Sequence, residues 1–400
     1  MAHVGPTPVR SSAPEIELLI CIAGRELDEA QRLRMAELLN GPLDWQQLLK
    51  LAQQHRLIAL LLKHLNDHSA RAVPRAVLTQ LEQAVLRLKQ RNLYLVSTLF
   101  GLLDLLAEQD IRAVPYKGPA LASVLYGHIG LRSFGDLDIF VRRKDVLLAK
   151  ELLIKEGFQA EFRLTPFQEG RYLADQCEYN FTKAEGRLHV EIHWNVLPTF
   201  YAFDLKPELW WSRVEMVPLL GKPVWNFALD DLLFLLCLHG FKHCWDHLEL
   251  IGGIAELTRE MPSTKWLRLI EQAQEVRAMR AVGVGLWLAR DLFTCELPDA
   301  VCAVLTTDRA IERIATKMKA RILVPEYRSL TRLEQGIFHW RQRERRPDRL
   351  KCAYRLAIVP DMNDWLWWPL PDALSYGYYL TRPLRLLGKY VFFQRASGKG

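Results

Sequence analysis

Hydrophobic and polar side chains alternate with a period of two in two short stretches near the middle of the chain. The first stretch runs from Asp136 to Val141, where Leu137 and Ile139 fall on the same face as Val141. Asp136 and Asp138 fall together on the opposite face, because successive side chains of a strand point to opposite sides. The pattern therefore predicts a strand that buries one face in a core and presents two carboxylates on the other.

The second alternating stretch covers residues 187–194 and predicts another strand with one polar face. Its apolar side chains share one face and its polar side chains share the other: Val190, Ile192 and Trp194 against His189, Glu191 and His193. We expect this strand to lie beside the first one, so that Glu191 becomes a third carboxylate near the acidic pair. The alternative is a half-exposed strand whose polar face is simply solvated.

A turn before the acidic strand has the composition of an anion-binding site. The apolar segment 111–116 predicts a strand, Gly118 ends it, and Pro119 suits the first turn of a helix. The N-terminus of a helix that follows a strand attracts anions, and Lys117 adds a positive charge there. Arg132, shortly before the acidic pair, has a planar guanidinium that can reach a phosphate.

Two carboxylates held close together on one strand repel each other unless a cation lies between them. Mg²⁺ prefers oxygen ligands of this kind and commonly shares them with substrate phosphates. Two such ions would activate an attacking oxygen and stabilise a leaving group. An Asp-X-Asp tripeptide alone is more often a solvated turn. The inference of a metal-assisted phosphoryl or nucleotidyl transfer site therefore depends on the turn at Gly118 and on Glu191.

The periodicity divides the chain into a central part with strands and two flanking parts made of helices. Asp28 and Asp44 are predicted N-caps, and a long amphipathic helix is predicted after Pro74. After the acidic strand, Gly157 is predicted to end a helix in a βαβ-like alternation. The predicted organisation is a disordered N-terminus (1–14), a helical region (15–106), a core with the strands and the chemistry (107–225), a helical C-terminal region (226–392) and a flexible tail (393–400).

The composition is that of a globular protein without a membrane segment. Half of the 400 residues are apolar and a quarter are charged, which is typical of a folded chain with a large core. Seven cysteines at scattered positions argue against a disulfide framework and favour a reducing compartment. No apolar run approaches the roughly 18 residues of a spanning helix, and no signal peptide is recognisable. We therefore expect a cytoplasmic protein.

In this order, the motifs resemble those of the nucleotidyltransferase superfamily of the DNA polymerase beta type. More narrowly, they resemble an uncharacterised nucleotidyltransferase family of bacterial gene clusters. The resemblance spans about residues 15–390 and is carried by these segments: Lys117-Gly118 with Leu121, Tyr126 and Arg132; Gly135-Asp136-Leu137-Asp138; Val190-Glu191-Ile192-His193-Trp194; His239-Gly240 with His243 and Trp245; and Tyr378-Tyr379 followed by Arg382-Pro383-Leu384-Arg385-Leu386.

The resemblance implies an α/β (α+β) fold in which a small mixed β-sheet, the nucleotidyltransferase core, is flanked by helical regions. It also implies a nucleoside triphosphate donor such as ATP, with Mg²⁺ (Mn²⁺ as an alternative) as the cofactor. Asp136 and Asp138 would be metal ligands, Glu191 would be the third carboxylate and metal ligand, and Lys117 with Gly118 would form the phosphate-binding turn. Further nucleotide contacts are expected from four residues: Arg132, His193, His239 and His243.

The chain departs from the pattern of this family at three points. The turn has a lysine and a proline around Gly118, where superfamily members usually carry Gly-Gly or Gly-Ser, and the spacing from Gly118 to Asp136 is longer than in the common pattern. The family tends to have an acid in the helix after Trp245, where this chain has Gly252-Gly253. These departures leave the three carboxylates intact but do not support the usual mode of triphosphate binding, and we expect no acid in that helix.

Two histidines and two cysteines in residues 237–244 form another group of candidate ligands. His239 and His243 are four residues apart and share one face of a predicted helix, as do Cys237 and Cys244. These residue types suit zinc, but their spacing is not that of a zinc finger, and the apolar residues before them predict a buried helix. We expect instead that His239 or His243 faces the active-site cleft and contacts nucleotide or acceptor.

The C-terminal region combines basic and aromatic residues. The chain has a net charge of +7, and part of the local excess lies in residues 341–349 and at Arg382, Arg385 and Lys389. Basic surfaces attract polyanions without specifying which. Aromatic residues nearby could stack on bases or lie at a membrane surface: Trp365, Trp367, Trp368, Tyr376, Tyr378 and Tyr379. We favour a solvated basic face on a helical domain, with RNA binding or peripheral membrane contact as alternatives.

Together these features predict a Mg²⁺-dependent nucleotidyltransferase that moves a nucleoside monophosphate from an NTP to a hydroxyl or phosphate acceptor and releases pyrophosphate. The acceptor stays open among small molecules, peptides and RNA, with nucleic acid not favoured. Two alternatives belong to other classes: a glycosyltransferase that uses a sugar nucleotide, and a non-catalytic nucleotide-binding scaffold. On the favoured hypothesis, Asp138→Asn should abolish transfer and leave thermal stability nearly unchanged.

Overall fold

The two alternating stretches form neighbouring strands at the centre of a five-stranded sheet in the computed structural model, which describes residues 13–324 and 330–396. The strands are β1 (Ala113–Pro115), β2 (Asp136–Val141), β3 (Gln159–Ala160), β4 (Glu178–Lys183), β5 (Leu188–His193), β6 (Glu215–Leu219) and β7 (Lys222–Asn226). The sheet order is β1-β2-β5-β4-β3, and β6 and β7 form a separate hairpin. The sheet is mixed, because β2 and β5 are parallel whereas the other neighbours are antiparallel.

Helices account for most of the remaining chain. The N-terminal helices are α1 (Pro14–Cys21), α2 (Glu29–Asn40), α3 (Trp45–Gln54), α4 (Ile58–His68) and α5 (Arg75–Ala107). Between the strands lie α6 (Gly118–Tyr126), α7 (Val146–Lys155), α8 (Pro166–Asp175) and α9 (Pro207–Trp211). The C-terminal helices are α10 (Leu229–Lys242), α11 (Leu248–Glu260), α12 (Trp266–Glu275), α13 (Met279–Phe293), α14 (Asp299–Thr307), α15 (Arg309–Ile322), α16 (Arg332–Arg341), α17 (Arg346–Ile358), α18 (Met362–Trp367) and α19 (Tyr378–Ala396).

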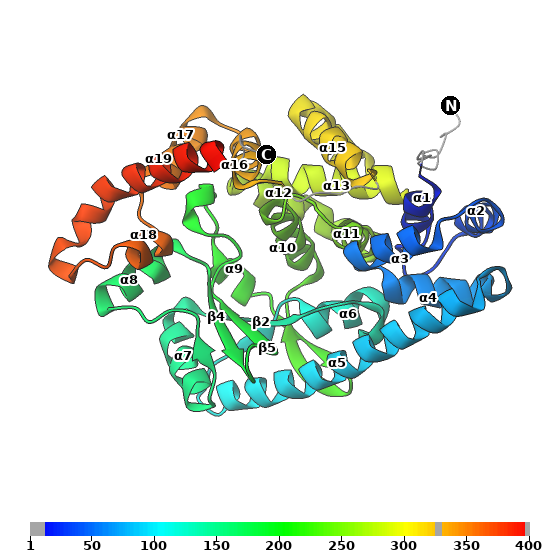
Figure 1. Cartoon of the computed structure of the whole chain (residues 1–400), viewed down its shortest axis with the longest axis horizontal. Coiled ribbons are helices and arrows are strands. Elements are labelled where there is room, and N and C mark those ends of the chain that lie inside the picture. The colour runs from blue at the N-terminus through cyan, green and yellow to red at the C-terminus, as the bar shows by residue number, and fades with distance from the viewer. Residues whose placement is uncertain (1–12, 325–329, 397–400) are drawn as a thin grey trace.

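One face of the sheet is buried under α5 and α7 (Figure 1). Leu137, Ile139 and Val141 of β2 lie in this layer and are fully buried, as are Val190 and Ile192 of β5. Burial of each such side chain contributes about 1.5–3 kcal/mol relative to its exposure. A shift of register by one residue would expose the whole set, so the pairing of these strands is strongly specified. The predicted polarity of both strands is therefore confirmed.

The opposite face of the sheet carries the polar residues of β2 and β5 and lies under α10 and α11 (Figure 1). At one end of this face, Phe140 packs edge-on or tilted against four aromatic rings, those of Tyr116, Trp210, Trp211 and Phe227. This aromatic cluster closes the end of the face that lies away from the acidic pair. The charged end of β2 is left to border a polar cavity.

The N-terminal helices begin where the sequence predicts. Asp28 caps α2 in a capping box, accepting a 2.7 Å hydrogen bond from the Gln31 amide. Asp44 caps α3 by accepting hydrogen bonds from the first amides of that helix. Pro74 immediately precedes the 33-residue helix α5. Local capping chemistry is enough to set these boundaries, because each cap satisfies amides that have no partner within the helix.

The predicted ends of the chain need correction where the structure describes them. Residues 1–12 and 397–400 lie outside the described residues, but α1 begins at Pro14, inside the segment predicted to be disordered. Ile16 and Leu18 of this helix are fully buried in the main core, which is why the segment is ordered. At the other end, α19 continues to Ala396, past residue 393, where a flexible tail was predicted.

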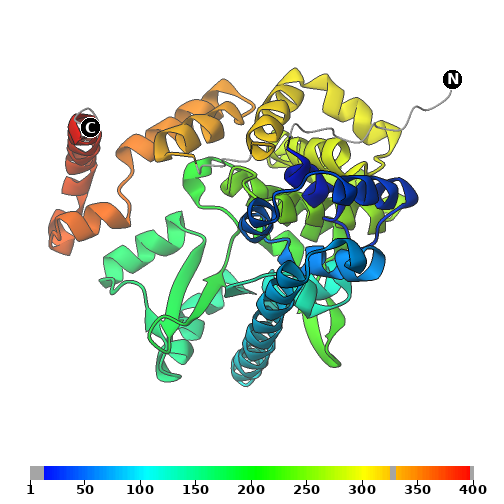
Figure 2. The same ribbon diagram turned by 45° about the vertical axis from the view of Figure 1, so that its right-hand side comes forward.

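The first and the last helices of the described chain lie on opposite sides of the molecule, whereas α13 packs against α1. Helices α1 to α4 are at one side and α17 to α19 at the other in both ribbon views (Figures 1 and 2). In the part of the chain that the structure describes, no helix combines the length and apolar character needed to cross a bilayer. The predicted fold class is confirmed: an α/β (α+β) protein with a small mixed sheet between helical regions.

Candidate active site

The register of β2 and β5 sets the predicted carboxylates side by side. Asp138 of β2 is paired with Glu191 of β5, and Asp136 is paired with His189 two positions earlier. Because the strands are parallel and their side chains alternate, Asp136, Asp138 and Glu191 share one face of the sheet. Two segments far apart in the sequence thus contribute acids to one place.

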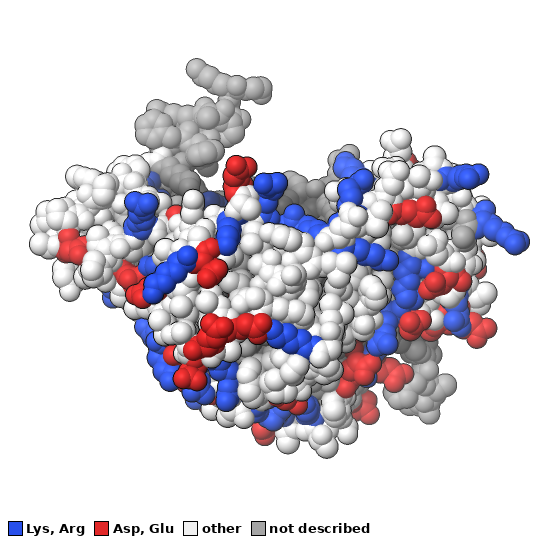
Figure 3. Space-filling view, turned by 90° about the horizontal axis from the view of Figure 1, so that it is seen from below, with Lys and Arg blue, Asp and Glu red and all other residues white. Residues whose placement is uncertain are grey.

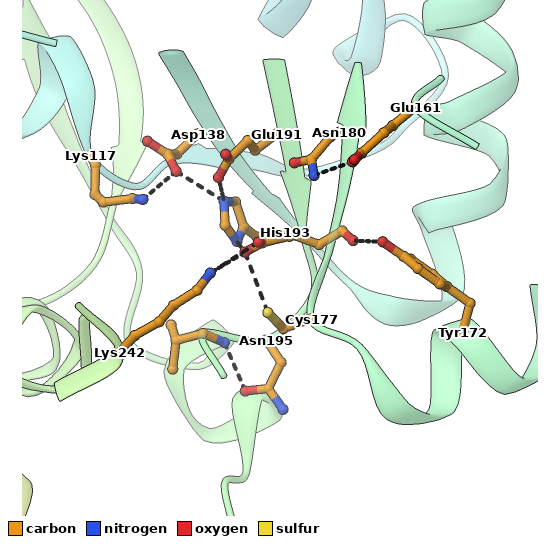
Figure 4. Close-up of polar contacts among 12 residues, drawn as sticks. Lys117, Asp138, Glu161, Tyr172, Cys177, Asn180, Glu191, His193, Asn195 and Lys242 are labelled. Atoms are coloured by element: carbon orange, nitrogen blue, oxygen red, sulfur yellow. Dashed lines mark hydrogen bonds and ion pairs between the residues drawn. The ribbon is translucent and has the colours of Figure 1, made fainter. Parts of the chain in front are cut away.

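His193 lies between the two most buried of these acids (Figure 4). Its Nε2 atom lies 3.0 Å from Asp138 Oδ1 and 3.0 Å from Glu191 Oε2. The Lys117 ammonium forms an ion pair with the same Asp138 oxygen. Asp138 and His193 are only 3 % and 1 % exposed. Among the described residues, Asp138, Glu191 and His193 are one of two groups whose ligand atoms all lie within 4.8 Å of one another, close enough to share a metal ion.

A second group of charged residues lies on the other side of the His193 ring. Glu178 Oε2 of β4 lies 3.4 Å from His193 Nδ1. Lys242, at the end of α10, donates to both carboxylate oxygens of Glu178 at 2.9 and 2.8 Å. The Cys177 thiol donates to the same carboxylate. Both ring nitrogens of His193 therefore face carboxylates, and negative charges this close favour the charged imidazolium.

Burial and ion pairing shift the pKa values in this cluster. Burial alone would lower the pKa of His193, but its hydrogen bonds to Asp138 and Glu191 outweigh burial and raise that pKa to about 9. Burial would raise the pKa of Asp138, but the Lys117 charge and His193 hold it well below its usual range. Burial raises the pKa of Glu191, and the nearby Asp138 charge adds to the effect. At neutral pH Asp138 is ionised, whereas Glu191 accepts a proton more readily than an ordinary glutamate.

The turn before α6 lies next to Asp138 because β1 pairs with β2. The Tyr116 amide donates a 3.0 Å hydrogen bond to the Asp138 carbonyl, and α6 begins at Gly118 with Pro119 in its first turn, as predicted. Gly118 has a φ of +52°, a left-handed conformation that residues with a Cβ rarely adopt. Glycine therefore allows the chain to reverse between the strand and the helix while Lys117 points to the acids.

These side chains line a cavity of about 260 Å³, which we call the catalytic cavity. It includes every predicted site residue except His193, which lies beneath the acids: Lys117, Gly118, Arg132, Asp136, Asp138, Glu191, His239 and His243. Asp136 is half-buried, and its carboxylate makes no hydrogen bond or ion pair within residues 13–324 and 330–396. The two aspartates thus differ in environment, since Asp138 is paired and buried while Asp136 faces the cavity.

His239 and His243 line the catalytic cavity, but the neighbouring cysteines do not. Burial lowers the pKa of both histidines, that of His243 to about 3, so both rings are neutral at neutral pH. Cys237 is buried in the hydrophobic core, and Cys244 Sγ lies 3.7 Å from His339 Nε2. Among the described residues, neither cysteine belongs to a group with metal-ligand spacing. The zinc site considered from the sequence is therefore not assembled, because the two cysteines point into different parts of the core.

Arg132 lines the catalytic cavity together with an acid that was not expected there. Arg132 Nε lies 2.5 Å from Glu249 Oε1, and both side chains are buried. Glu249 belongs to α11, the helix after Trp245, so the expectation that this helix lacks an acid is wrong. The acid lies one turn before the glycine pair, and Gly252 instead permits close packing, since a Cβ there would lie 3.1 Å from the Ala23 carbonyl. The available signal was that Glu249 is the only acid in the apolar first two turns of this helix, before Glu256.

Other charged residues reach the catalytic cavity from elements that no short motif connects. They come from the turn after α3, from β4, from the end of α10 and from the loop before α11: Arg56, Glu178, Lys242, Asp246 and His247. Arg56 and Glu178 lie in segments with no pattern that points to a site, whereas Lys242, Asp246 and His247 lie in or next to the segment from His239 to Trp245 that carries part of the resemblance. Only the packing of α10 and α11 over the sheet brings them to the carboxylates.

Several basic residues of the C-terminal region lie inside the protein. Arg382 forms ion pairs with Asp361 at 2.8 Å and with Asp364 at 2.6 Å, and Arg385 pairs with Asp364 at 2.6 Å. The expectation of a solvated basic face is therefore wrong for these two arginines, because two nearby aspartates neutralise them. The side chain of Lys389 lies outside the described part of the structure.

Arg343, in the basic run 341–349, is also internal. It is 1 % exposed and donates a 3.0 Å hydrogen bond to the Tyr201 carbonyl. On the face of the molecule seen from below, Lys and Arg side chains are interspersed with Asp and Glu over the described residues (Figure 3). Charges of both signs are mixed on this face, so it does not have the single-sign potential typical of nucleic-acid-binding surfaces.

The sequence model of a protein family described as uncharacterised nucleotidyltransferase matches residues 41–294. The match covers well over half of the chain, every strand and every predicted site residue. The chain belongs to this family. No curated protein matches it. The family indicates a transferase that uses an NTP donor, and the carboxylate and histidine cluster of this nucleotidyltransferase lies inside the matched region.

Proposed function

We propose that this nucleotidyltransferase is a Mg²⁺-dependent enzyme that transfers a nucleoside monophosphate from an NTP to a hydroxyl or phosphate acceptor and releases pyrophosphate. One observation carries the proposal. Asp138 and Glu191 lie opposite each other on parallel strands, with Asp136 on the same face and the Gly118 turn on the same cavity. Transfer of a phosphorus group needs this combination of acids and phosphate-binding groups in one place.

The donor set of the cavity fits a hard divalent cation. Asp138 and Glu191 supply carboxylate oxygens whose separation suits a shared ion, and Asp136 adds a carboxylate with no partner among the described residues. His193 lies beside these oxygens, but its raised pKa keeps the ring protonated at neutral pH, so its nitrogen would become a ligand only if a bound ion displaced that proton. The Lys117 ammonium and His193 balance the acids in this structure. A bound divalent ion would neutralise phosphate charge and lower the pKa of an acceptor hydroxyl.

The protein groups have separate roles in the proposed reaction. Lys117 and the Gly118 turn bind phosphate oxygens of the donor, and Arg132, oriented by Glu249, adds a second positive charge on the cavity wall. The acceptor oxygen attacks the α-phosphorus, the bond to the bridging oxygen breaks, and pyrophosphate leaves. Glu191, whose raised pKa suits a proton acceptor, takes the proton of an acceptor hydroxyl.

The neutral histidines on the opposite wall are suited to contact an uncharged part of a substrate. His239 and His243 can each donate and accept one hydrogen bond at neutral pH, because burial keeps both rings unprotonated. A base, a ribose or an acceptor hydroxyl has complementary groups. We place this chemistry in a reducing compartment such as the cytoplasm, a proposal supported by the seven cysteines, all of which are free thiols.

Calorimetric titration of each of the four NTPs, with and without Mg²⁺, tests the proposal. We expect Mg²⁺-dependent binding of at least one NTP, its loss in Asp136→Ala, and its retention in the control Asp145→Ala. Asp145 is also half-buried but lies beyond the other end of β2. If no NTP binds, the proposal fails. Hydrolysis of a sugar nucleotide without pyrophosphate release would favour the glycosyltransferase alternative.

A further inference from the structure

A second and larger cavity continues the catalytic cavity on the side of α3 and α5. Its volume is about 590 Å³, and the two cavities share Arg56 and Ser133. The catalytic cavity, at about 260 Å³, is smaller than the roughly 300–1,000 Å³ of most small-molecule sites. A substrate larger than its reacting groups must therefore extend into a neighbouring space.

This larger cavity, which we call the basic groove, is lined by three cations and by no carboxylate: Lys50, Arg56 and Arg87. None of the three forms an ion pair within the described ranges 13–324 and 330–396. Three glutamines add amide groups and four apolar residues complete the wall: Gln46, Gln53, Gln80, Leu49, Ile58, Ala84 and Leu88. Cations without counter-charges produce a positive potential that attracts anions. The lining therefore suits a phosphate attached to an organic body.

Hydrogen bonds fix the basic groove relative to the carboxylates. Arg91 of α5 donates a 3.0 Å hydrogen bond to the carbonyl of Gly135, the residue before β2. Asn92 donates to the Arg132 carbonyl at 2.9 Å. Arg87 lies four residues before Arg91, which is about one helical turn. The helix that carries part of the groove is thus attached to the loop that leads into the acidic strand.

The cavity on the other side of the site has the opposite character. It has a volume of about 340 Å³ and shares Glu178 with the catalytic cavity. Four acids line it: Glu161, Asp175, Glu178 and Asp361. Its two arginines are already engaged, Arg382 with aspartates and Arg355 with a backbone carbonyl. Of the two spaces next to the catalytic cavity, only the basic groove favours an anionic group.

We propose that the basic groove is a second phosphate-binding subsite, which holds a phosphate of the substrate while the reacting phosphorus is at the carboxylates. Guanidinium and ammonium groups recognise phosphate oxygens by charge-assisted hydrogen bonds. The phosphate comes either from the end of the donor triphosphate or from a phosphorylated acceptor. The role in transfer rests on the proposed function, but phosphate binding in the groove does not.

Inorganic tripolyphosphate, titrated without divalent ions, is the probe for this subsite. The test variant is Lys50→Gln combined with Arg87→Gln, because these residues line the groove and not the catalytic cavity. The control is Arg75→Gln, an exposed arginine of the same helix outside the groove. We expect the double variant to raise the dissociation constant about tenfold and to flatten its salt dependence, while the control matches the wild type.

Two further titrations identify the source of the phosphate and separate this proposal from the previous one. If saturating NTP with Mg²⁺ prevents tripolyphosphate binding, the groove holds the donor's phosphates; if tripolyphosphate still binds through Lys50 and Arg87, it holds the acceptor's. We expect Asp136→Asn to lose transfer but to keep tripolyphosphate binding. Because the two readouts are independent, the subsite proposal can hold even if the catalytic proposal fails. The subsite proposal is overturned if the wild type does not bind tripolyphosphate, or if the double variant binds it equally well at every salt concentration.

Discussion

Two buried ionic clusters in this molecule use similar residues but differ in what their carboxylates face. The sheet cluster consists of Lys117, Asp138, Glu178, Glu191, His193 and Lys242. The C-terminal cluster consists of Asp361, Asp364, Arg382 and Arg385. In the C-terminal cluster, the carboxylate oxygens are taken up by guanidinium groups and by backbone amides at the start of α18. In the sheet cluster, the acids border the catalytic cavity beside Asp136, whose carboxylate has no such partner among the described residues.

The comparison shows that a perturbed pKa does not by itself identify a functional acid. Ion pairs with arginine hold the pKa of Asp361 below its usual range despite burial, as Lys117 and His193 do for Asp138. The C-terminal cluster also borders a cavity, through Asp361 and Arg382, so what separates the two clusters is whether the acids beside the cavity are paired. The sheet cluster faces a cavity with an acid that has no partner among the described residues, Asp136, whereas the C-terminal cluster pairs its own charges. We therefore propose a catalytic role for the first cluster and a role in stability for the second.

The largest expected effect is that of Asp138→Asn. We expect transfer to fall by about 10³-fold or more, because the lost ligand contributes several kcal/mol to the barrier. The metal-free protein should also lose about 3 kcal/mol of unfolding free energy, since breaking a buried ion pair leaves Lys117 uncompensated. This changes the expectation from the sequence, which was that stability would be nearly unaffected. Turnover assays and urea unfolding measure the two effects.

Asp136→Asn is the matched control within the same strand. Its side chain is half-buried and has no ion pair among the described residues, so we expect a comparable loss of transfer with an unfolding free energy within about 0.5 kcal/mol of the wild type. Equal destabilisation by the two variants would mean that the difference in environment between Asp136 and Asp138 has no energetic consequence.

Asp364→Asn should have the reverse profile. Arg382 and Arg385 both depend on Asp364, so removing its charge should lower the unfolding free energy by about 3 kcal/mol. Transfer per folded molecule should stay within about twofold, because Asp364 does not line the catalytic cavity. Urea unfolding and turnover at a temperature where the variant is folded give the two numbers. Loss of transfer in folded Asp364→Asn protein would contradict the assignment of this cluster to stability.

The smallest expected effect is on the acid side of the pH–stability curve. Burial lowers the pKa of His339 to about 3, of His243 to about 3 and of His55 to about 4. In the unfolded chain these groups titrate near 6.5. Each therefore contributes stability that is present above pH 6.5 and is lost as the pH falls towards its folded value. Between pH 6.5 and 5.5 the loss approaches about 1 kcal/mol per histidine.

Two variants test whether this pH dependence of stability comes from the buried histidines or from the C-terminal cluster. His339→Gln should have a shallower decline in unfolding free energy between pH 6.5 and 5.5. Asp364→Asn should keep the wild-type slope, because the lowered pKa of the neighbouring Asp361 keeps the titration of that carboxyl below this pH range. Unfolding curves at several pH values test both. If His339→Gln and the wild type decline in parallel, His339 does not stay neutral in the folded protein.

Local patterns explain why much of the fold was predictable. The alternation in residues 136–141 and 188–193 gives the correct face for every acid and every buried aliphatic residue of the two strands, because the side-chain period of a strand leaves only two choices. Asp28 and Asp44 mark the helix starts, since capping is a matter of neighbouring amides. Gly118 could be predicted to end a strand because few other residues accept its backbone conformation.

The residues that were missed belong to long-range contacts. Glu249 reaches Arg132 across more than a hundred residues of sequence, and Glu178 reaches Lys242 from a different layer. From the sequence, Arg382 and Arg385 were predicted to lie on a basic surface. The structure instead places Asp361 and Asp364 beside them. Neither periodicity nor spacing in the sequence predicts these ion pairs, because the two charged side chains come together only when the helices and strands pack.

The sequence alone determined which residues could hold a cation and which strand faces they occupy. It determined this because backbone geometry ties neighbouring side chains to fixed directions. Only the tertiary structure decided that Asp138 is neutralised by Lys117 and His193 while Asp136 is left facing the cavity. It also decided that the site is adjoined on one side by a groove whose cations form no ion pair with any described residue, and on the other by an acid-lined cavity. The physical reason is that burial and pairing of charges depend on distances between segments, which the order of residues does not fix.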